Sequence, residues 1–144
     1  MKSDPVAVSI VLSDYVICEQ GTRKNSLIGC FHNFNSARFP FVTPPFFITS
    51  AITNLDVVDT EFNLCARIED PKDGAILTSV SGPVKFPEGS NWTKETVFEF
   101  PMPVMPFVVS HAGLYKVELR VNNEPAGHRF LMVNAITAQS TPQQ

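Results

Sequence analysis

The sequence predicts an all-β fold, an antiparallel β-sandwich of about 7–9 strands, from three features. Residues 113–121 alternate apolar and polar side chains with a period of two, which places the two sets on opposite faces of a strand. The chain of 144 residues contains 12 Phe and 12 Pro, a composition typical of strands interrupted by turns. Turn signals separate short apolar stretches at intervals of roughly 8–12 residues, and no stretch has the period of a long helix.

A β-hairpin is predicted at the start of the chain. Apolar residues alternate over 6–13, and the alternation changes face near residues 14–15, where we expect a bulge or a bend. The polar segment 20–25 is a turn, and residues 26–31 return as the second strand. Residues 32–45 contain three prolines, which predicts a loop crossing from one sheet to the other, because each proline removes a backbone donor.

Four more strands are predicted in the middle of the chain. They cover residues 46–55, 60–69, 75–80 and 95–100. The turn at 70–74 contains Pro and Asp-Gly, which are strong turn formers. Gly82 and Pro83 are expected to end the third of these strands. The three prolines within 101–106 are expected to keep that segment out of any ladder.

The last third of the chain predicts a short pairing at 107–109, a central strand at 113–121 and a final strand at 128–136. Residues 138–144 are rich in Gln, Ser and Thr and have no large apolar side chain to pack. The expected organisation is one sandwich domain over 1–137 followed by a flexible tail over 138–144.

The Gly-Leu-Tyr sequence at 113–115 indicates which type of β-sandwich the chain forms. A tyrosine that enters a late strand just after a turn can donate its hydroxyl to upstream backbone, as in the tyrosine corner of immunoglobulin-like domains. We therefore expect structural roles for Gly113 and Tyr115 in an immunoglobulin-like sandwich. The chain lacks the Cys…Trp…Cys spacing of antibody domains.

Charge and hydropathy exclude several classes of protein. A formal net charge of −3 without a large basic cluster argues against nucleic-acid binding. No apolar run is long enough to span a bilayer, and the first residues lack the apolar core of a signal peptide. The expectation is a soluble, cytoplasmic protein that binds neither nucleic acid nor membrane.

No motif in the sequence predicts catalysis, a metal or a cofactor. His32, His111 and His128 are not at a zinc-ligand spacing from one another or from a cysteine. Ser110 and His111 are adjacent in sequence, so on a strand they point to opposite faces and do not form a nucleophile–base pair. We expect no enzyme activity, no metal and no cofactor.

The three cysteines, Cys18, Cys30 and Cys65, form no CxxC pair. The expected state is three free, buried thiols in a reducing compartment. A disulfide between Cys18 and Cys30, which flank the predicted hairpin turn, is the less favoured alternative.

A Phe-rich segment is the one feature that suggests a binding site. Six phenylalanines fall within residues 31–47, at positions 31, 34, 39, 41, 46 and 47. The favoured interpretation is that they close one end of the core, because aromatic residues in a Pro-rich loop usually bury. The alternative is an exposed interaction surface, and Arg38 among the rings favours it. The residues of this hypothetical surface are Phe34, Arg38, Phe39 and Phe41.

The chain also resembles a family of small uncharacterised bacterial proteins. The resemblance rests on Asp14 to Ile17, residues 21–31, Phe39-Pro40, the Pro-Pro-Phe-Phe at 44–47 and Gly113 to Tyr115. It implies a bacterial, immunoglobulin-like sandwich with no assigned activity, and it provides no catalytic or binding residues.

Together these observations predict a protein-interaction or scaffolding module without catalytic activity. Its partner would be an unknown protein or a second copy of the chain, bound through residues 31–47 or an edge strand. The alternative is a carbohydrate- or small-ligand-binding domain that uses Trp92 and Phe39 as an aromatic platform.

Overall fold

The structure is a computed structural model that describes residues 4–56, 61–86 and 89–137, and these residues contain eleven strands and no helix. No described segment is therefore a helix that could cross a membrane. The strands are β1 (Val6–Cys18), β2 (Asn25–Phe31), β3 (Asn33–Ser36), β4 (Phe41–Val42), β5 (Phe46–Thr53), β6 (Glu61–Glu69), β7 (Ile76–Lys85), β8 (Phe98–Val104), β9 (Val108–Val109), β10 (Gly113–Val121) and β11 (Glu124–Ala135). The all-β prediction is confirmed, and the tail expected at 138–144 lies outside the described residues.

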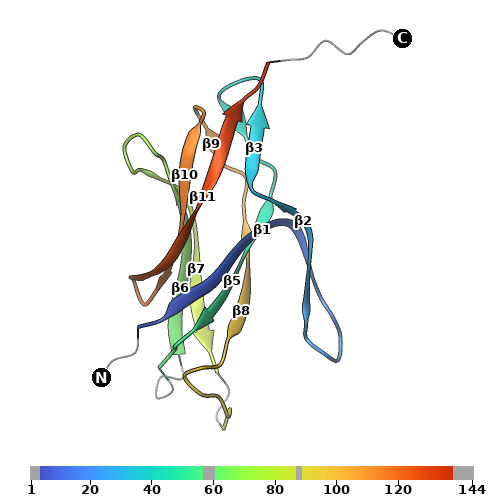
Figure 1. Ribbon diagram of the computed structural model, residues 1–144, viewed down its shortest axis with the longest axis vertical. Coiled ribbons are helices and arrows are strands. Elements are labelled where there is room, and N and C mark those ends of the chain that lie inside the picture. The colour runs from blue at the N-terminus through green and yellow to red at the C-terminus, as the bar shows by residue number, and fades with distance from the viewer. Residues whose placement is uncertain (1–3, 57–60, 87–88, 138–144) are drawn as a thin grey trace.

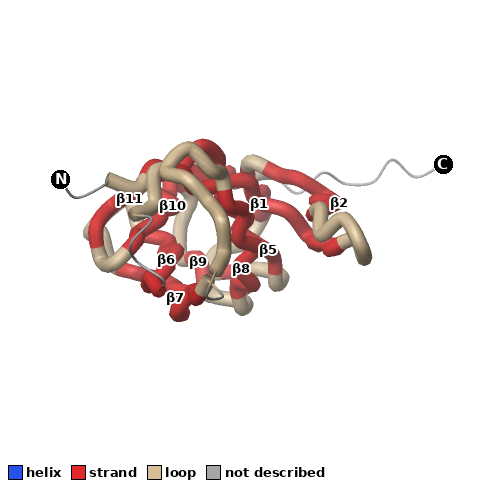
Figure 2. The backbone as a smooth tube through the Cα atoms, turned by 90° about the horizontal axis from the view of Figure 1, so that it is seen from below, coloured by secondary structure: helices blue, strands red, loops and turns tan. Residues whose placement is uncertain are grey.

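Two sheets form the layers of a sandwich (Figures 1 and 2). Sheet A has the strand order β2-β1-β5-β8, and sheet B has the order β3-β11-β10-β6-β7. Strands β4 and β9 form a separate pair. Pairing is antiparallel except between β3 and β11, which run parallel. The predicted antiparallel sandwich is confirmed with this one parallel pair, which forms because the chain enters sheet B from sheet A at this edge instead of through a hairpin.

Residues 32–45 cross between the sheets as predicted, but they are not all loop. Strand β3 pairs with β11, and the two residues of β4 pair with β9. These short strands raise the number of strands above the expected range. The sequence did not predict them, because segments of two to four residues show no periodic pattern.

The core lies between the sheets and follows the predicted alternation. In β10, Tyr115, Val117 and Leu119 are buried to 1% exposure or less. Apolar residues of β5 face them from sheet A, and those of the neighbouring strand β6 lie beside them: Phe46, Ile48, Ile52, Phe62, Leu64, Ala66 and Ile68. Each fully buried Leu, Ile or Val contributes about 1.5–3 kcal/mol relative to an exposed position. This packing makes β10 a central strand of sheet B.

Two expectations about proline were wrong. Gly82 and Pro83 lie within β7, and Pro101 and Pro103 lie within β8. Both strands are at the edge of their sheets, so one side of each has no neighbouring strand to which its backbone would donate hydrogen bonds. Residues two apart direct their backbone nitrogens to the same side, and the nitrogens of Pro101 and Pro103 therefore share the free edge of β8. Prolines at a free edge also hinder unwanted strand pairing.

The β1–β2 hairpin extends beyond sheet A. Strand β1 pairs with β5 only as far as Ser13, and its remaining residues pair with β2 alone. The register shift in β1 lies between Ala7 and Ser9, so the bulge considered near residues 14–15 is absent there. After its last pair with β5, strand β1 bends, and the hairpin leaves the sandwich (Figures 1 and 2). We call residues 14–30 the arm.

Candidate interaction site

The aromatic residues predicted as an interaction surface pack against the core. Phe34, Phe39 and Phe41 are half-buried. The ring centroid of Phe34 lies 5.7 Å from that of Phe46, and those of Phe39 and Phe41 are 5.5 Å apart. These contacts match the interpretation that the rings close one end of the core. They leave Arg38 as the exposed member of the predicted set, and a role for it in binding stays a prediction.

Trp92 belongs to a second aromatic cluster. Its ring centroid lies 4.9 Å from Phe86 and 5.4 Å from Phe98, and Phe86 continues the cluster to Phe62 at 5.7 Å. The segment 89–97 before β8, which contains Trp92, and the segment 37–40 between β3 and β4, which contains Phe39, lie at opposite ends of the sandwich (Figure 1). Trp92 and Phe39 therefore do not form one platform, which corrects the arrangement expected for a carbohydrate site.

The cysteines also differ from expectation. Cys18 and Cys30 are exposed and Cys65 is partly buried, and all three are free thiols. Cys18 lies opposite Asn25 in the hairpin, whereas Cys30 lies opposite Ser13. The two are several rungs of the ladder apart, beyond the roughly 7 Å between Cα atoms that a disulfide spans. The expectation that free thiols are buried fails for Cys18 and Cys30 because the arm has no core on either side.

A polar cluster joins the β6–β7 turn to the start of β10. The Nε2 atom of His111 lies 3.0 Å from each carboxylate oxygen of Asp70, and its Nδ1 lies 2.9 Å from the carbonyl oxygen of Ala112. The backbone N–H of Lys72, followed by His111, holds the pKa of Asp70 below its ordinary value. Both nitrogens of His111 are engaged, so neither is available to Ser110 as a base.

A second polar cluster lies on the outer face of sheet B. Glu118 is 5% exposed, with Arg67 at 2.9 Å and Lys116 at 3.0 Å, and it also accepts a hydrogen bond from Arg120. Burial raises the pKa of Glu118, but the hydrogen bonds from Arg120 and Lys116 and the charge of Arg67 outweigh it and lower the pKa. The cluster joins two adjacent strands, β6 and β10, and its fully paired carboxylate indicates a structural role.

The described residues contain no group of three His, Cys, Asp or Glu side chains that could hold a metal ion. The three histidines have separate partners in the structure. His111 contacts Asp70, His32 accepts a hydrogen bond from Arg129 at 2.9 Å, and His128 packs on Phe130.

The arm exposes apolar side chains that the sequence did not single out. Tyr15 is 66% exposed, Ile17 51% and Ile28 45%. Tyr15 lies opposite Ile28 in the hairpin, and Ile17 is two residues from Tyr15, so all three share one face. Alternation alone predicts burial for such residues, and only the bend of β1 shows that nothing covers them.

A groove of about 490 Å³ lies where the arm leaves the sandwich. Its lining comes from the arm, the start of β5 and the end of β8: Asp14, Tyr15, Pro44, Pro45, Phe46, Phe47, Pro103, Val104 and Met105. Met105 is 72% exposed. The groove is therefore apolar, with one carboxylate, that of Asp14.

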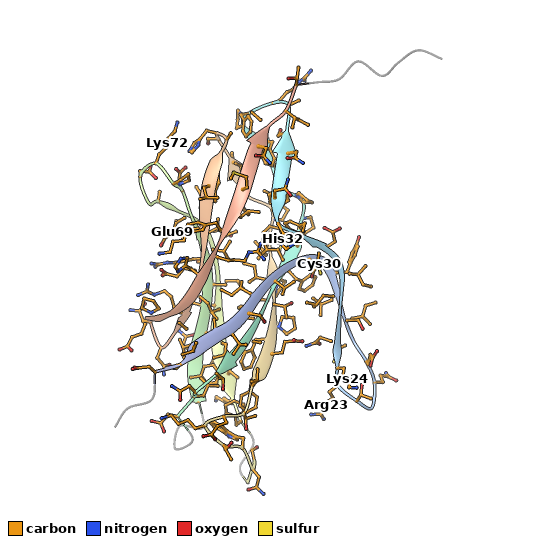
Figure 3. The ribbon with its side chains drawn as sticks, in the orientation of Figure 1. Arg23, Lys24, Cys30, His32, Glu69 and Lys72 are labelled. Carbon is orange, nitrogen blue, oxygen red and sulfur yellow. The ribbon has the colours of Figure 1, made fainter. Side chains whose placement is uncertain are left out.

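Two local features accompany the arm, a glycine whose position leaves little room for a side chain and a hydrogen bond to sheet A. Gly29 has a φ of +69°, and a Cβ atom there would collide with the carboxylate of Asp14 on the opposite strand. Near the tip, the side-chain amide of Asn25 donates a 2.7 Å hydrogen bond to Glu99 of β8. Arg23 and Lys24 project from the tip itself (Figure 3). Among the described residues, neither cation has an ion-pair partner, and neither does Asp14.

A family model described as "Family of unknown function (DUF6941)" matches residues 8–134. The chain belongs to this family. No curated protein matches the chain. Among solved structures, it is similar to a glycosyl hydrolase family 2 member from Bacteroides cellulosilyticus, with a TM-score of 0.40 and 17% identity. That match covers 72% of this chain and 14% of the other, and so weak a likeness carries no argument about function.

Within this DUF6941 member, the arm contains most of the residues on which the sequence resemblance rests, Asp14 to Ile17 and residues 21–31. They make an apolar face, a groove with one carboxylate and a basic tip. Such a surface offers contact area and charge, so it is suited to binding.

Proposed function

We propose that this chain is a protein-interaction module without catalytic activity, and that the arm is its contact surface. The observation that carries the proposal is the exposure of Tyr15, Ile17 and Ile28 together on one face of a hairpin that projects from the sandwich. Exposed apolar patches on soluble proteins mark interaction sites, because their burial against a partner is favourable by about 25 cal/mol per Å².

Two observations support the absence of catalysis. His111 is adjacent to Ser110 in sequence, but both its ring nitrogens already have hydrogen-bond partners. The most buried carboxylate of the ion-pair cluster, Glu118, is surrounded by cations and is not poised as a general acid.

We also infer an immunoglobulin-like topology from the strand pairing. Strands β1-β5-β8 have the order of immunoglobulin strands A, B and E, and β6-β10-β11 have the order of C, F and G. Tyr115 near the start of β10 then takes the place of the tyrosine corner in strand F. The exposed free thiols of Cys18 and Cys30 suit a reducing compartment, which supports a cytoplasmic location.

Site-specific photo-crosslinking tests the proposed function. p-Benzoylphenylalanine replaces Tyr15 on the arm in one variant, and in a control it replaces Ile76, which is 54% exposed on edge strand β7. Illumination in lysate of the native host is expected to give a protein adduct from position 15 and none from position 76. No adduct at position 15, or equal adducts at both positions, would contradict the proposal.

The carbohydrate-binding alternative has less support, because the segments that contain Trp92 and Phe39 lie at opposite ends of the sandwich (Figure 1) and both side chains are half-buried. Thermal shift against a glycan panel tests it. A response that Trp92→Ala abolishes would favour this alternative, and a flat response would count against it.

A further inference from the structure

The groove at the base of the arm lies on the side of the arm that is turned toward sheet A. Asp14 and Cys18 share one face of β1, because residues an even number apart point to the same side of a strand. Asn25 lies opposite Cys18 in the hairpin, and its side-chain amide donates a hydrogen bond to Glu99 of β8. Asp14 therefore lines the groove from the inner face of the arm, which is the reverse of the apolar face that contains Tyr15.

The opposite wall of the groove belongs to sheet A and is apolar. Phe46 is 1% exposed in the core, so Phe47, the next residue of β5, points to the outer face of the sheet. Pro103 lies opposite Phe47 on β8, and the exposed side chain of Met105 extends this wall. Together with residues 44–45, the wall contains three prolines, which have no backbone N–H to donate to a ligand. Recognition in the groove therefore depends on side-chain contacts and on one charge.

The charge in the groove is the carboxylate of Asp14. Among the described residues, this carboxylate has no ion-pair partner. Gly29 on the neighbouring strand keeps the space beside it free, because a Cβ atom there would collide with the carboxylate. The groove volume of about 490 Å³ lies within the range of about 300–1,000 Å³ that is typical of ligand sites. The complementary ligand is a cation with apolar surroundings.

A peptide segment meets this requirement better than a small amine. An ion pair that remains accessible to water contributes little to affinity by itself. Most of the affinity must then come from apolar groups on either side of the cation, against Phe47, Pro103 and Met105. Arginine and lysine combine an apolar stem with a charged head, so the stem can lie along the apolar wall while the head reaches Asp14.

We propose that the groove binds an extended segment of a partner protein, in which one Arg or Lys pairs with Asp14 and the flanking residues are apolar. This inference rests on the proposed function and specifies the chemistry of the partner. Aromatic-lined grooves on other domains bind extended peptides through side-chain contacts of this kind.

Peptide selection on the immobilised full chain tests the proposal. The probe is a phage-displayed library of random dodecapeptides, selected in parallel on the wild type and on Asp14→Lys. The wild type is expected to enrich peptides that contain Arg or Lys between apolar residues, and Asp14→Lys should lose this preference because it places a like charge in the groove. No enriched sequence, or enriched sequences without a basic residue, would overturn the proposal.

Fluorescence anisotropy with one selected, labelled peptide measures the contribution of each wall. Asp14→Asn keeps the shape of the side chain and should raise the dissociation constant about fivefold, near the upper limit for an exposed ion pair. Met105→Ser should also raise it, and the domain should stay folded because Met105 is 72% exposed. Asp4→Asn, at an exposed carboxylate before the other end of β1, is the control and should leave it unchanged. Equal dissociation constants for the wild type and Asp14→Asn would overturn the proposal.

Other occupants of the groove give different results. Displacement of the peptide by an equal concentration of arginine amide would show that the groove binds a small cation. A dimer in sedimentation velocity that Asp14→Asn abolishes would show that a second copy fills it. Either result would overturn the proposal. A protein adduct at position 15 without any enriched basic peptide would uphold the proposed function while this inference fails.

Discussion

The hydroxyl of Tyr115 donates a 2.7 Å hydrogen bond to the carbonyl oxygen of His111, four residues upstream. This is the hydrogen bond that the Gly-Leu-Tyr sequence predicts. Tyr115 is 1% exposed, so its ring is held in the core and the bond fixes the turn before β10 to it.

Removing that hydroxyl is expected to destabilise the protein. Tyr115→Phe keeps the ring in the core and leaves the carbonyl oxygen of His111 without its donor, so the free energy of unfolding should fall by about 1 kcal/mol. Urea denaturation measures the change. Tyr15→Phe, at an exposed tyrosine of the arm, is the control and should leave the midpoint unaltered. An unchanged midpoint in Tyr115→Phe would refute the structural role of the corner.

A side chain at Gly29 is expected to destabilise the protein. Gly29→Ala adds a Cβ atom in a left-handed conformation and pushes it against Asp14, so we expect a loss of about 1–2 kcal/mol. Gly21→Ala is the control, because Gly21 also has a positive φ but its Cβ would meet nothing within 4 Å. Urea denaturation should show a smaller loss for Gly21→Ala, and Asp14→Ala should recover part of the loss at Gly29. Equal losses at the two glycines would show that the contact with Asp14 is unimportant.

Stability is expected to fall in acid through Glu118. Its folded pKa is lowered from the ordinary value of 4.5, so its contribution is present above that pH and is lost as the pH falls through the folded pKa. Glu118→Gln should cost about 2 kcal/mol at pH 7, a typical value for hydrogen bonds to a charged group. It should also make stability less dependent on pH below the ordinary pKa. Denaturation midpoints measured from pH 7 to pH 3 test both effects. Glu61→Gln, which removes an exposed pair at 3.9 Å, should change neither.

The Phe-rich segment is expected to behave as core. Phe39→Asp or Phe41→Asp buries a charge among aromatic rings and should unfold the domain or cost several kcal/mol. Arg38→Ala, at an exposed position in the same segment, should have no effect on the thermal midpoint. A folded Phe39→Asp variant that loses self-association would instead support the binding role predicted for these residues.

The limits of sequence reasoning are clear at particular residues. Period-two alternation identified the buried face of β10 and β6 correctly, since each of these strands packs one face on the core. The expectation that proline ends a strand failed for Pro83, Pro101 and Pro103, because tolerance of proline depends on whether a strand lies at the edge of its sheet. Strand order is a property of the whole fold and leaves no local signal.

The arm was missed for a related reason. Residues 6–18 look like one strand, and the hairpin was predicted, but whether Tyr15 and Ile17 are covered depends on where the neighbouring strand β5 stops. The same holds for Cys18 and Cys30, which were expected to be buried and are exposed. A candidate site made of exposed apolar residues is therefore invisible until the sheets are assembled.

The sequence by itself determined that this chain is built of strands, which residues of the central strands enter the core, and that Tyr115 bonds to the turn before it. These are consequences of backbone geometry within a few residues. The tertiary structure decided which strands are edges, how the parallel β3–β11 pair forms, and that the first hairpin leaves the sandwich with its apolar face uncovered. Those outcomes depend on contacts between residues far apart in the chain, and such contacts follow from packing the whole molecule.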